Sequence, residues 1–509
     1  MEINIFLFFI NIVIENSARL CYNLSIVLYK GEKSVSIKAD DINKKGLDAQ
    51  ELSQSELQEN IAKTVANYYP PTSQSVKDHL EWFRDQKLGL MVHWGLYNEI
   101  GIKESWVLVD KDWTKWQFKP GTPNKEVKEI YSKLHKGFMP LRFDPEEWAE
   151  RAEQAGFRYL CFTTKHHDGF CMWDTATTDY KVTGSEVPFR SEKHADITRA
   201  LFDSFRKRGM GISAYYSRAD FSCPYYWEEG YGMKDGTERV PSYDPNKEPE
   251  KWQKFKDFVF AQLKELVSDY GKIDILWYDG GCDGEQLGLP EMTEELRQIQ
   301  PHLLGVVRTS RGGRCQDFIT PELIIPNRYI DTPWEACTVM GKPIMEYGRD
   351  YVSFGYTFDQ DYMSAKEIAH LLLDVVAKGG NLALNVAAQP DGRLPGRALI
   401  QLEELGRWMK IFSPAIYETR EAAPYRYGSY AYTRSKDRKR VNVFLLYGDG
   451  ERIADSYTFR CEDAVRAVGF MRGGECLDFS QKDGYVTAVI PEALRGREGD
   501  IADCFVLEI

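Results

Sequence analysis

Strand-like and helix-like segments alternate along this chain from Leu80 to Pro414, and that alternation constrains the fold more than any other feature. Six short apolar runs have the length of buried strands: residues 88–94, 159–164, 211–217, 273–279, 303–308 and 381–387. Amphipathic stretches with helix start or stop signals separate them, one opening at Asp144 and others over 195–209, 252–270, 293–299 and 364–378. Strands and helices in this order predict a parallel α/β fold.

A barrel is the form of α/β fold that we expect. Two more strands, around residues 328–335 and 344–356, would complete an eight-stranded (β/α)8-like TIM barrel with long insertions. A doubly wound sheet is the alternative, but no glycine-rich phosphate loop follows any of the strand-like runs.

The pattern changes after Pro414. Short runs separated by Gly and Asp turns predict a C-terminal antiparallel β-sandwich; they cover residues 430–433, 441–446, 467–470, 486–490 and 504–509. The expected organisation is therefore an N-terminal extension at 1–75, the barrel at 76–414 and the sandwich at 415–509.

The N-terminal extension begins with an apolar segment, Ile3 to Ile14, that is too short to span a membrane. Glu2 stands where a signal peptide carries basic residues, and no small-residue cleavage site follows. We expect a strand of a small β element or an added leader, followed by a polar linker. A cytoplasmic location is favoured, and a secreted or periplasmic one is the alternative if the segment is a signal peptide.

Composition narrows the classes of function. The formal net charge of −12 disfavours a nucleic-acid surface, which needs clustered Lys and Arg. The ten cysteines show no zinc-binding spacing and are expected to be reduced and buried. Aromatic residues reach 13%, and such rings stack on the apolar faces of sugars as well as filling cores.

Polar residues that could take part in binding or catalysis stand where the strand-like runs end. Asp279 closes the run that begins at Ile273, and is interpreted either as a loop cap or as a catalytic carboxylate. His93 closes the first run, and His166 and His167 close the second. We considered a metal site, but no second carboxylate or thiol is close in sequence. Hydrogen bonding to the hydroxyls of a polar ligand is the preferred interpretation.

Aromatic side chains accompany these polar residues at the strand ends. Tyr215 and Tyr216 end the third run, and Trp277 lies two residues before Asp279 on the same strand face. Donors and acceptors for hydroxyls together with rings for C–H faces are what a sugar site requires.

The sequence resembles the α-L-fucosidases of glycoside hydrolase family 29. The resemblance rests on an ordered set of segments: HWGLY (93–97), KHHDGFCMWDTATTDY (165–180), AYYS (214–217), LWYDGG (276–281), DFITPE (317–322), PWEACT (333–338), SFGY (353–356) and KGGNLALNV (378–386). Each segment alone is weakly specific, whereas the ordered set is highly specific. The resemblance implies a (β/α)8-like barrel with a C-terminal β-sandwich, as the pattern does.

The resemblance also implies roles for particular residues. The family works by double displacement with retention, and its nucleophile corresponds to Asp279. The expected substrate-binding residues are His93, Glu104, Trp106, His166, His167, Tyr216, Trp277 and Arg311, with Arg308 as the alternative arginine. Ser105 stands between Glu104 and Trp106, where the family has an adjacent Glu-Trp pair.

The acid/base residue is the least determined. Glu335 in PWEACT is the first choice, because desolvation beside an aromatic residue would raise its pKa. Glu346 is the alternative. For each of them a surface salt bridge is the competing interpretation.

The predicted function is that of an exo-acting retaining α-L-fucosidase acting on fucosylated oligosaccharides or glycoconjugates. An α-L-galactosidase and a catalytically silent carbohydrate-binding barrel are the alternatives. We expect no metal, no cofactor, no nucleic-acid partner and no membrane span, and a homo-oligomer is compatible with the sequence.

Overall fold

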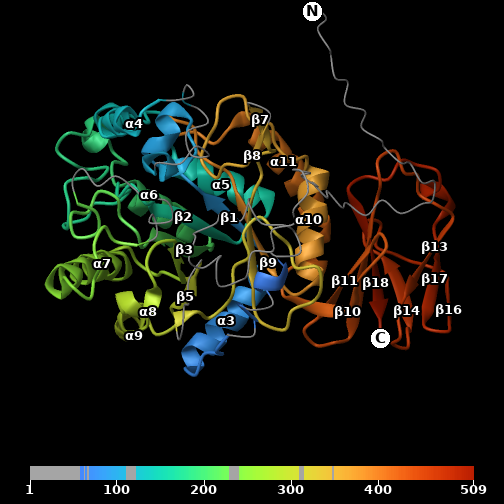
Figure 1. The fold of residues 1–509 in the computed structure, drawn as a ribbon. Helices are drawn as coiled ribbons and strands as arrows, with labels where there is room; N and C mark the ends of the chain where they lie inside the picture. The colour runs from blue at the N-terminus through green and yellow to red at the C-terminus, as the bar shows by residue number, and fades with distance from the viewer. Residues whose placement is uncertain are drawn as a thin grey trace, which may run out of the picture. The chain divides into compact units, whose positions relative to one another are not determined.

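Seven parallel strands form the main sheet of the computed structural model (Figure 1). In spatial order they are β5 (Leu304–Val307), β4 (Ile275–Asp279), β3 (Gly211–Ser217), β2 (Tyr159–Lys165), β1 (Leu88–Val92), β9 (Asn381–Asn385) and β6 (Glu335–Val339). The structure describes residues 58–61, 64–65, 68–109, 118, 122–228, 240–308, 315–346 and 349–509. The predicted apolar leader and most of the predicted linker lie outside these residues.

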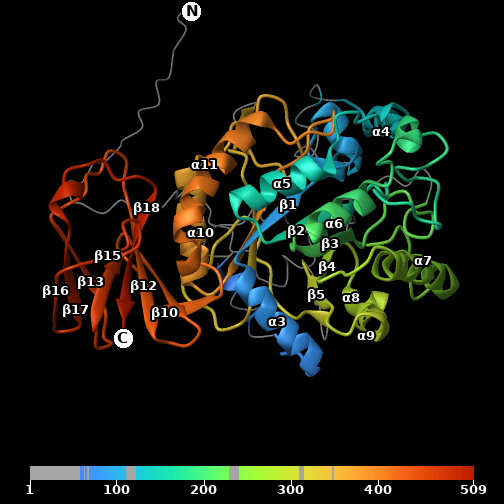
Figure 2. The ribbon, with the colours of Figure 1, turned by 180° about the vertical axis from the view of Figure 1, so that it is seen from behind.

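Helices alternate with the strands and cover the outside of the sheet, except α3 (Gln74–Gln86), which precedes β1 and packs Leu80 and Phe83 in the same apolar cluster as Trp277 of β4. The other helices are α4 (Asn124–Tyr131), α5 (Pro145–Ala155), α6 (Ile197–Lys207), α7 (Pro249–Asp269), α8 (Gly284–Leu287), α9 (Leu289–Ile299), α10 (Ala365–Ala377) and α11 (Gly396–Phe412). Figure 2 shows α5, α11 and α10 side by side. Alternation of parallel strands and covering helices confirms the predicted α/β class.

Local sequence signals explain where two of these helices begin and end. Asp144 accepts hydrogen bonds from the first-turn backbone of α5, Pro145 occupies the first position, and Gly156 ends the helix with φ +96°. Ser364 and Glu367 form a reciprocal capping box at the start of α10. The helix starts predicted at Asp144 and Ser364 are therefore confirmed.

Among the residues that the structure describes, the barrel closes without the eighth strand that the sequence predicts. Six predicted strands are present, and the one expected at 328–335 instead runs over Glu335–Val339. The stretch predicted as a strand at 344–356 contains the antiparallel hairpin β7 (Ile344–Glu346) and β8 (Arg349–Tyr351), which is separate from the main sheet.

An irregular segment takes the place of the missing strand. The backbone N–H of Asp317 donates to Gly305 on β5 at 2.8 Å, and the N–H of Glu335 on β6 donates to Ile319 at 2.9 Å. Glu322 also forms a parallel bridge with Cys337. Residues 315–323 thus connect the two edge strands, and we call them the closing segment.

Antiparallel sheets follow α11 and confirm the predicted sandwich. One has the order β10 (Thr419–Tyr427), β11 (Tyr430–Ser435), β12 (Arg440–Leu446), β18 (Ala502–Glu508), β14 (Ala467–Phe470), β15 (Glu475–Cys476). The other has the order β13 (Ser456–Arg460), β17 (Tyr485–Val489), β16 (Phe479–Lys482). Both contribute to one apolar core that includes Val443, Phe505, Phe459 and Val486. The predicted residue limits of the three segments stay predictions.

In the described part of the chain, no helix combines the length and the apolar character needed to cross a bilayer.

Candidate active site

The carboxyl ends of neighbouring strands bring the predicted polar residues together. His93 follows β1, His166 and His167 follow β2, Asp279 ends β4 and Arg308 follows β5. The ring centroids of His93 and His166 are 5.9 Å apart, and those of His166 and His167 are 4.7 Å apart. The expectation that these side chains share one edge of the sheet is therefore correct, while their roles remain predictions.

Asp279 is buried, and its contacts keep its carboxylate ionised. Arg308 Nε donates to Oδ1 at 2.6 Å, the hydroxyl of Tyr215 donates to Oδ2, and His167 Nε2 lies 3.5 Å from Oδ2. Burial would raise the pKa of this carboxyl, but the charge of Arg308 and the contacts from His167 and Tyr215 hold it well below its usual range. A permanently anionic carboxylate at this position is suited to nucleophilic attack.

Tyr215, and not the predicted Tyr216, is the tyrosine of this site. The Tyr215 ring stacks on Trp277 at a centroid distance of 5.1 Å, and its hydroxyl contacts Asp279. The hydroxyl of Tyr216 instead donates to Gln262 on α7 at 2.7 Å and accepts from Lys165 at 3.0 Å. Adjacent residues of a strand point to opposite faces, so only one of the two reaches the barrel interior.

Hydrogen bonds fix the tautomer of His93 and the orientation of His166. His93 Nδ1 lies 2.8 Å from the amide oxygen of Asn385, which can only accept, so Nδ1 carries the proton and Nε2 is left as an acceptor. His166 Nδ1 contacts the hydroxyl of Ser105. Burial lowers the pKa of both histidines and of His167, that of His93 to about 4, so all three are neutral at pH 7.

One histidine nitrogen at the site has unused hydrogen-bonding capacity. His167 Nε2 is buried and has no hydrogen bond of normal geometry, although Asp279 is 3.5 Å away. Buried polar atoms are usually satisfied, and an unsatisfied one at a cluster of this kind is available to a ligand hydroxyl.

Close packing at Gly280 determines how the strand turns after Asp279. Gly280 has φ +45°, and an added Cβ would lie 2.4 Å from the ring of His167. Only glycine fits this backbone against the imidazole, so the glycine that follows Asp279 allows the carboxylate and His167 to approach each other.

Glu335 lies at the opposite end of its strand from the one the sequence predicts. It is the first residue of β6, and its buried carboxyl accepts from the Trp277 indole at 3.0 Å and from the Tyr159 hydroxyl. Burial raises its pKa to about 7, while these two hydrogen bonds lower it. Its contacts place it beneath Trp277 and not beside Asp279, so we correct its assignment from acid/base to a residue that orients Trp277.

Replacing Glu335 by Gln is expected to leave turnover within about 10-fold of the parent, whereas loss of a general acid costs about 10²–10⁴-fold. The folded-state pKa is about 7 and the ordinary value is 4.5. Between these values only the folded chain keeps the proton, so Glu335 makes stability fall as pH rises through this window. The free energy of unfolding of Glu335→Gln relative to the parent should therefore increase from pH 4.5 to pH 8, by on the order of 2–3 kcal/mol.

Denaturant unfolding at both pH values measures this difference, with Glu404→Gln, an exposed glutamate of α11, as the control that shows none. A loss of turnover above 100-fold with unchanged KM would restore the acid/base role to Glu335.

In the structure the two residues of the predicted pair, Glu104 and Trp106, have different surroundings. Trp106 places its ring 4.8 Å from that of His167, within the histidine cluster. Glu104 is buried but accepts from the hydroxyl of Ser353 at 2.9 Å and from the N–H of Gly355 at 2.6 Å. Burial raises the pKa of Glu104. Its carboxyl therefore holds the loop at Ser353–Gly355 in place.

That loop carries Phe354, an apolar residue of the SFGY segment that the sequence alone does not identify as a ligand contact. Its ring centroid lies 5.0 Å from that of His93, and its carbonyl accepts from the Asn385 amide at 2.8 Å. Phe354 thus places an apolar ring beside a histidine that can accept from a hydroxyl.

The structure adds Glu322 to the site as a second carboxylate beside Asp279. Arg308, the alternative arginine of the sequence analysis, contacts Glu322 through Nη1 and Asp279 through Nε. Glu322 belongs to the closing segment and its side chain is 17% exposed. The segment DFITPE contained the signal, but no strand periodicity indicated which end of the barrel it reaches.

Two predicted residues lie outside the described side chains. Arg311 lies outside the described residues. Glu346 ends the hairpin strand β7, and its side chain is not among those described.

His166, His167 and Asp279 also have the composition of a metal site, since one ligand atom of each lies within 4.8 Å of the others. Arg308 argues against a cation here. It is paired with both Asp279 and Glu322 and only 16% exposed, so it cannot leave without isolating one buried and one partly buried carboxylate. Hydroxyl recognition remains the preferred interpretation.

Comparison with known proteins shows what the chain is similar to. The family model described as alpha-L-fucosidase matches residues 56–413. A putative alpha-L-fucosidase of Caenorhabditis elegans is 27% identical over 357 residues, which are 67% of each chain. The tissue alpha-L-fucosidase of Homo sapiens is 27% identical over 364 residues, covering 67% of this chain and 69% of the relative.

Solved structures show the same similarity. Alpha-L-fucosidase isoenzyme 1 from Paenibacillus thiaminolyticus superposes with a TM-score of 0.68 at 27% identity, covering 86% of this chain and 99% of that one. The Thermotoga maritima alpha-fucosidase in complex with fucose gives 0.67 at 25% identity, covering 86% and 100%.

Proposed function

Since this chain belongs to the α-L-fucosidase family of glycoside hydrolases, we propose that it is an exo-acting, retaining enzyme that removes terminal α-L-fucosyl residues by double displacement. One observation carries the proposal: the buried carboxylate of Asp279, kept anionic by Arg308, lies in a cluster of neutral histidines and aromatic rings.

Asp279 is the proposed nucleophile. Its low pKa keeps it ionised over the working pH range, so it can attack the anomeric carbon and form a covalent fucosyl-enzyme. Tyr215 and Arg308 orient the carboxylate through their hydrogen bonds. These bonds weaken when ester formation removes the negative charge of Asp279. Neutral His167 adds no competing positive charge.

Glu322 is the proposed acid/base. A retaining glycosidase needs its two carboxyl groups about 5 Å apart. Arg308 touches both Asp279 and Glu322, which supports a separation of this order. The charge of Arg308 favours the carboxylate form of Glu322, so this role requires Glu322 to take up a proton when the substrate binds. Glu322 would then protonate the departing glycosidic oxygen in the first step and, as the resulting carboxylate, deprotonate the attacking water in the second.

Sugar recognition follows from the remaining side chains. His93 Nε2 is a fixed acceptor for a hydroxyl, and His166 and His167 offer further ring nitrogens. Trp106 adds an aromatic face, and Phe354 provides the apolar contact that suits the C5 methyl group of a 6-deoxy sugar. Fucosylated oligosaccharides or glycoconjugates are accordingly the proposed substrates.

Hydrolysis of 4-nitrophenyl α-L-fucoside tests the activity, and ¹H NMR of the first-formed sugar tests the stereochemistry. We expect α-L-fucose to appear before its β anomer. Initial release of the β anomer would exclude double displacement. Faster turnover of the matched α-L-galactoside would favour that alternative specificity, and saturable fucose binding without any hydrolysis would indicate a silent binding barrel.

A further inference from the structure

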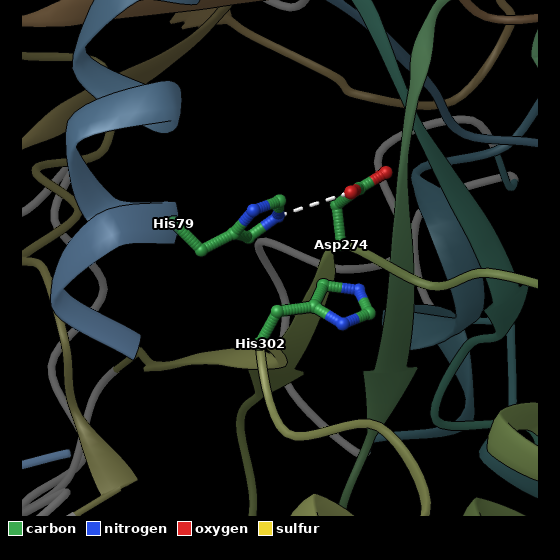
Figure 3. Close-up of side chains that lie close together, drawn as sticks. All are labelled: His79, Asp274 and His302. Atoms are coloured by element: carbon green, nitrogen blue, oxygen red, sulfur yellow. Dashed lines mark ion pairs between the residues drawn. The ribbon is translucent and has the colours of Figure 1, made fainter. Parts of the chain in front are cut away.

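A second histidine–carboxylate cluster lies at the other end of the barrel from Asp279. Figure 3 shows its three side chains. His79 comes from α3, Asp274 directly precedes β4, and His302 lies two residues before β5. One ligand atom of each side chain lies within 4.8 Å of the others. We propose that these three residues form a binding site for a divalent metal ion of the zinc class, separate from the active site.

The contact between His79 and Asp274 fits two ligands of one metal ion as well as an ion pair. Nε2 of His79 lies 3.0 Å from Oδ1 of Asp274. A shared proton would lie in line between the two atoms. A tetrahedral zinc about 2.0 Å from each would separate them by about 3.3 Å and hold the oxygen off the nitrogen's axis.

The surroundings hold these side chains in place. Trp82 stacks on His79 at a centroid distance of 4.3 Å, and His302 packs edge-on against it at 4.8 Å. The backbone N–H of Ile212 donates to the other oxygen of Asp274 at 2.8 Å. Supporting contacts of this kind orient metal ligands and reduce the cost of ordering them.

His302 has a backbone partner as well. Its Nε2 lies 3.1 Å from the carbonyl oxygen of Ile273. Figure 3 shows Nε2 on the side of the His302 ring that faces Asp274, so Nε2 is the ligand atom, and a metal ion must replace its contact with the Ile273 carbonyl. Two imidazoles and one carboxylate form a donor set that suits Zn²⁺, and water would complete the tetrahedron.

Lys272 is the group that a cation must displace, since its Nζ contacts Oδ1 of Asp274. Its side chain is 52% exposed, so it can move into solvent. This differs from Arg308, which is enclosed between two carboxylates. Lys272 therefore balances the charge of Asp274 until a metal ion takes its place.

Zinc binding to the full-length protein tests the proposal. After chelation and desalting, calorimetric titration with ZnCl₂ should show one saturable site, and Co²⁺ should give the visible absorption of a tetrahedral nitrogen–oxygen site. His302→Asn should weaken binding at least 10-fold and abolish that spectrum. Lys272→Gln should strengthen binding, because the competing cation is gone, and a merely structural role for the cluster would not produce this increase.

The chain offers a matched control at the other cluster. His166→Asn removes a histidine from the His166–His167–Asp279 group and should leave zinc affinity unchanged. Equal affinities for the parent and His302→Asn, loss of binding in His166→Asn, or no saturable binding to the folded parent would each overturn the proposal. Because the readout is metal binding, failure here is distinguishable from failure of the proposed hydrolysis.

Discussion

Asp279→Asn is expected to lower kcat/KM for an aryl α-L-fucoside by on the order of 10⁴-fold while the protein stays folded. The amide has nearly the size of the carboxylate, so Tyr215 and Arg308 keep their neighbour. It carries no charge and is a poor nucleophile, so the covalent intermediate cannot form. Steady-state kinetics with 4-nitrophenyl α-L-fucoside measures the loss.

A buried aspartate in a similar environment provides the control. Asp503 in β18 accepts from Arg472 Nε at 2.6 Å and from the Tyr447 hydroxyl at 2.8 Å, in the C-terminal sheet. Asp503→Asn should cost stability but keep kcat/KM near that of the parent. If Asp279→Asn loses no more activity than Asp503→Asn, Asp279 is not the nucleophile.

Azide adds a test of the role itself. In Asp279→Ala the anion can attack the anomeric carbon directly, and the product should be β-L-fucosyl azide, with inverted configuration. An α-configured azide from this variant would mean that another residue still forms the covalent intermediate.

The sequence was sufficient to predict six of the seven strands of the main sheet because these six are buried on both faces. Every residue of β1 to β5 is buried, and such strands appear in a sequence as continuous apolar runs between turn signals. Polar residues that end these runs must meet at one edge of a parallel sheet. His93, His166, His167 and Asp279 were therefore identified without knowledge of the register between strands.

Choosing between Tyr215 and Tyr216 did require the register. In the structure Tyr215 pairs with Trp277, and Ser217 pairs with Asp279, so Tyr215 shares their face of the sheet. Alternation within one strand gives two equally regular faces, and only the pairing with a neighbour shows which of them points inward.

The error at Glu335 arose from a strand boundary. A strand over 328–335 would have placed this residue at its carboxyl end, among the catalytic groups. β6 in fact begins at Glu335, and the same residue lies at the amino end. Boundaries are the least certain part of a prediction from sequence, and here a shift of one strand length exchanged the two ends of the barrel.

Glu322→Ala is the second variant with a large expected effect. It lies in the closing segment, whose irregular backbone has no periodicity to read, and its contact with Arg308 is what identifies it. Loss of the general acid should lower kcat by about 10²–10⁴-fold for substrates with poor leaving groups. For 2,4-dinitrophenyl α-L-fucoside, which needs no protonation to leave, the first step should be nearly unaffected.

Azide then distinguishes the two carboxylates by stereochemistry. In Glu322→Ala the covalent intermediate on Asp279 still forms, and azide replaces the water that has lost its base, so the product should be α-L-fucosyl azide with retained configuration. Glu335→Ala and Glu346→Ala should give no azide product. Formation of the α-azide by either of them, and not by Glu322→Ala, would transfer the acid/base role. Opposite anomers from Asp279→Ala and Glu322→Ala follow only if these residues act on opposite faces of the sugar, as a retaining mechanism requires.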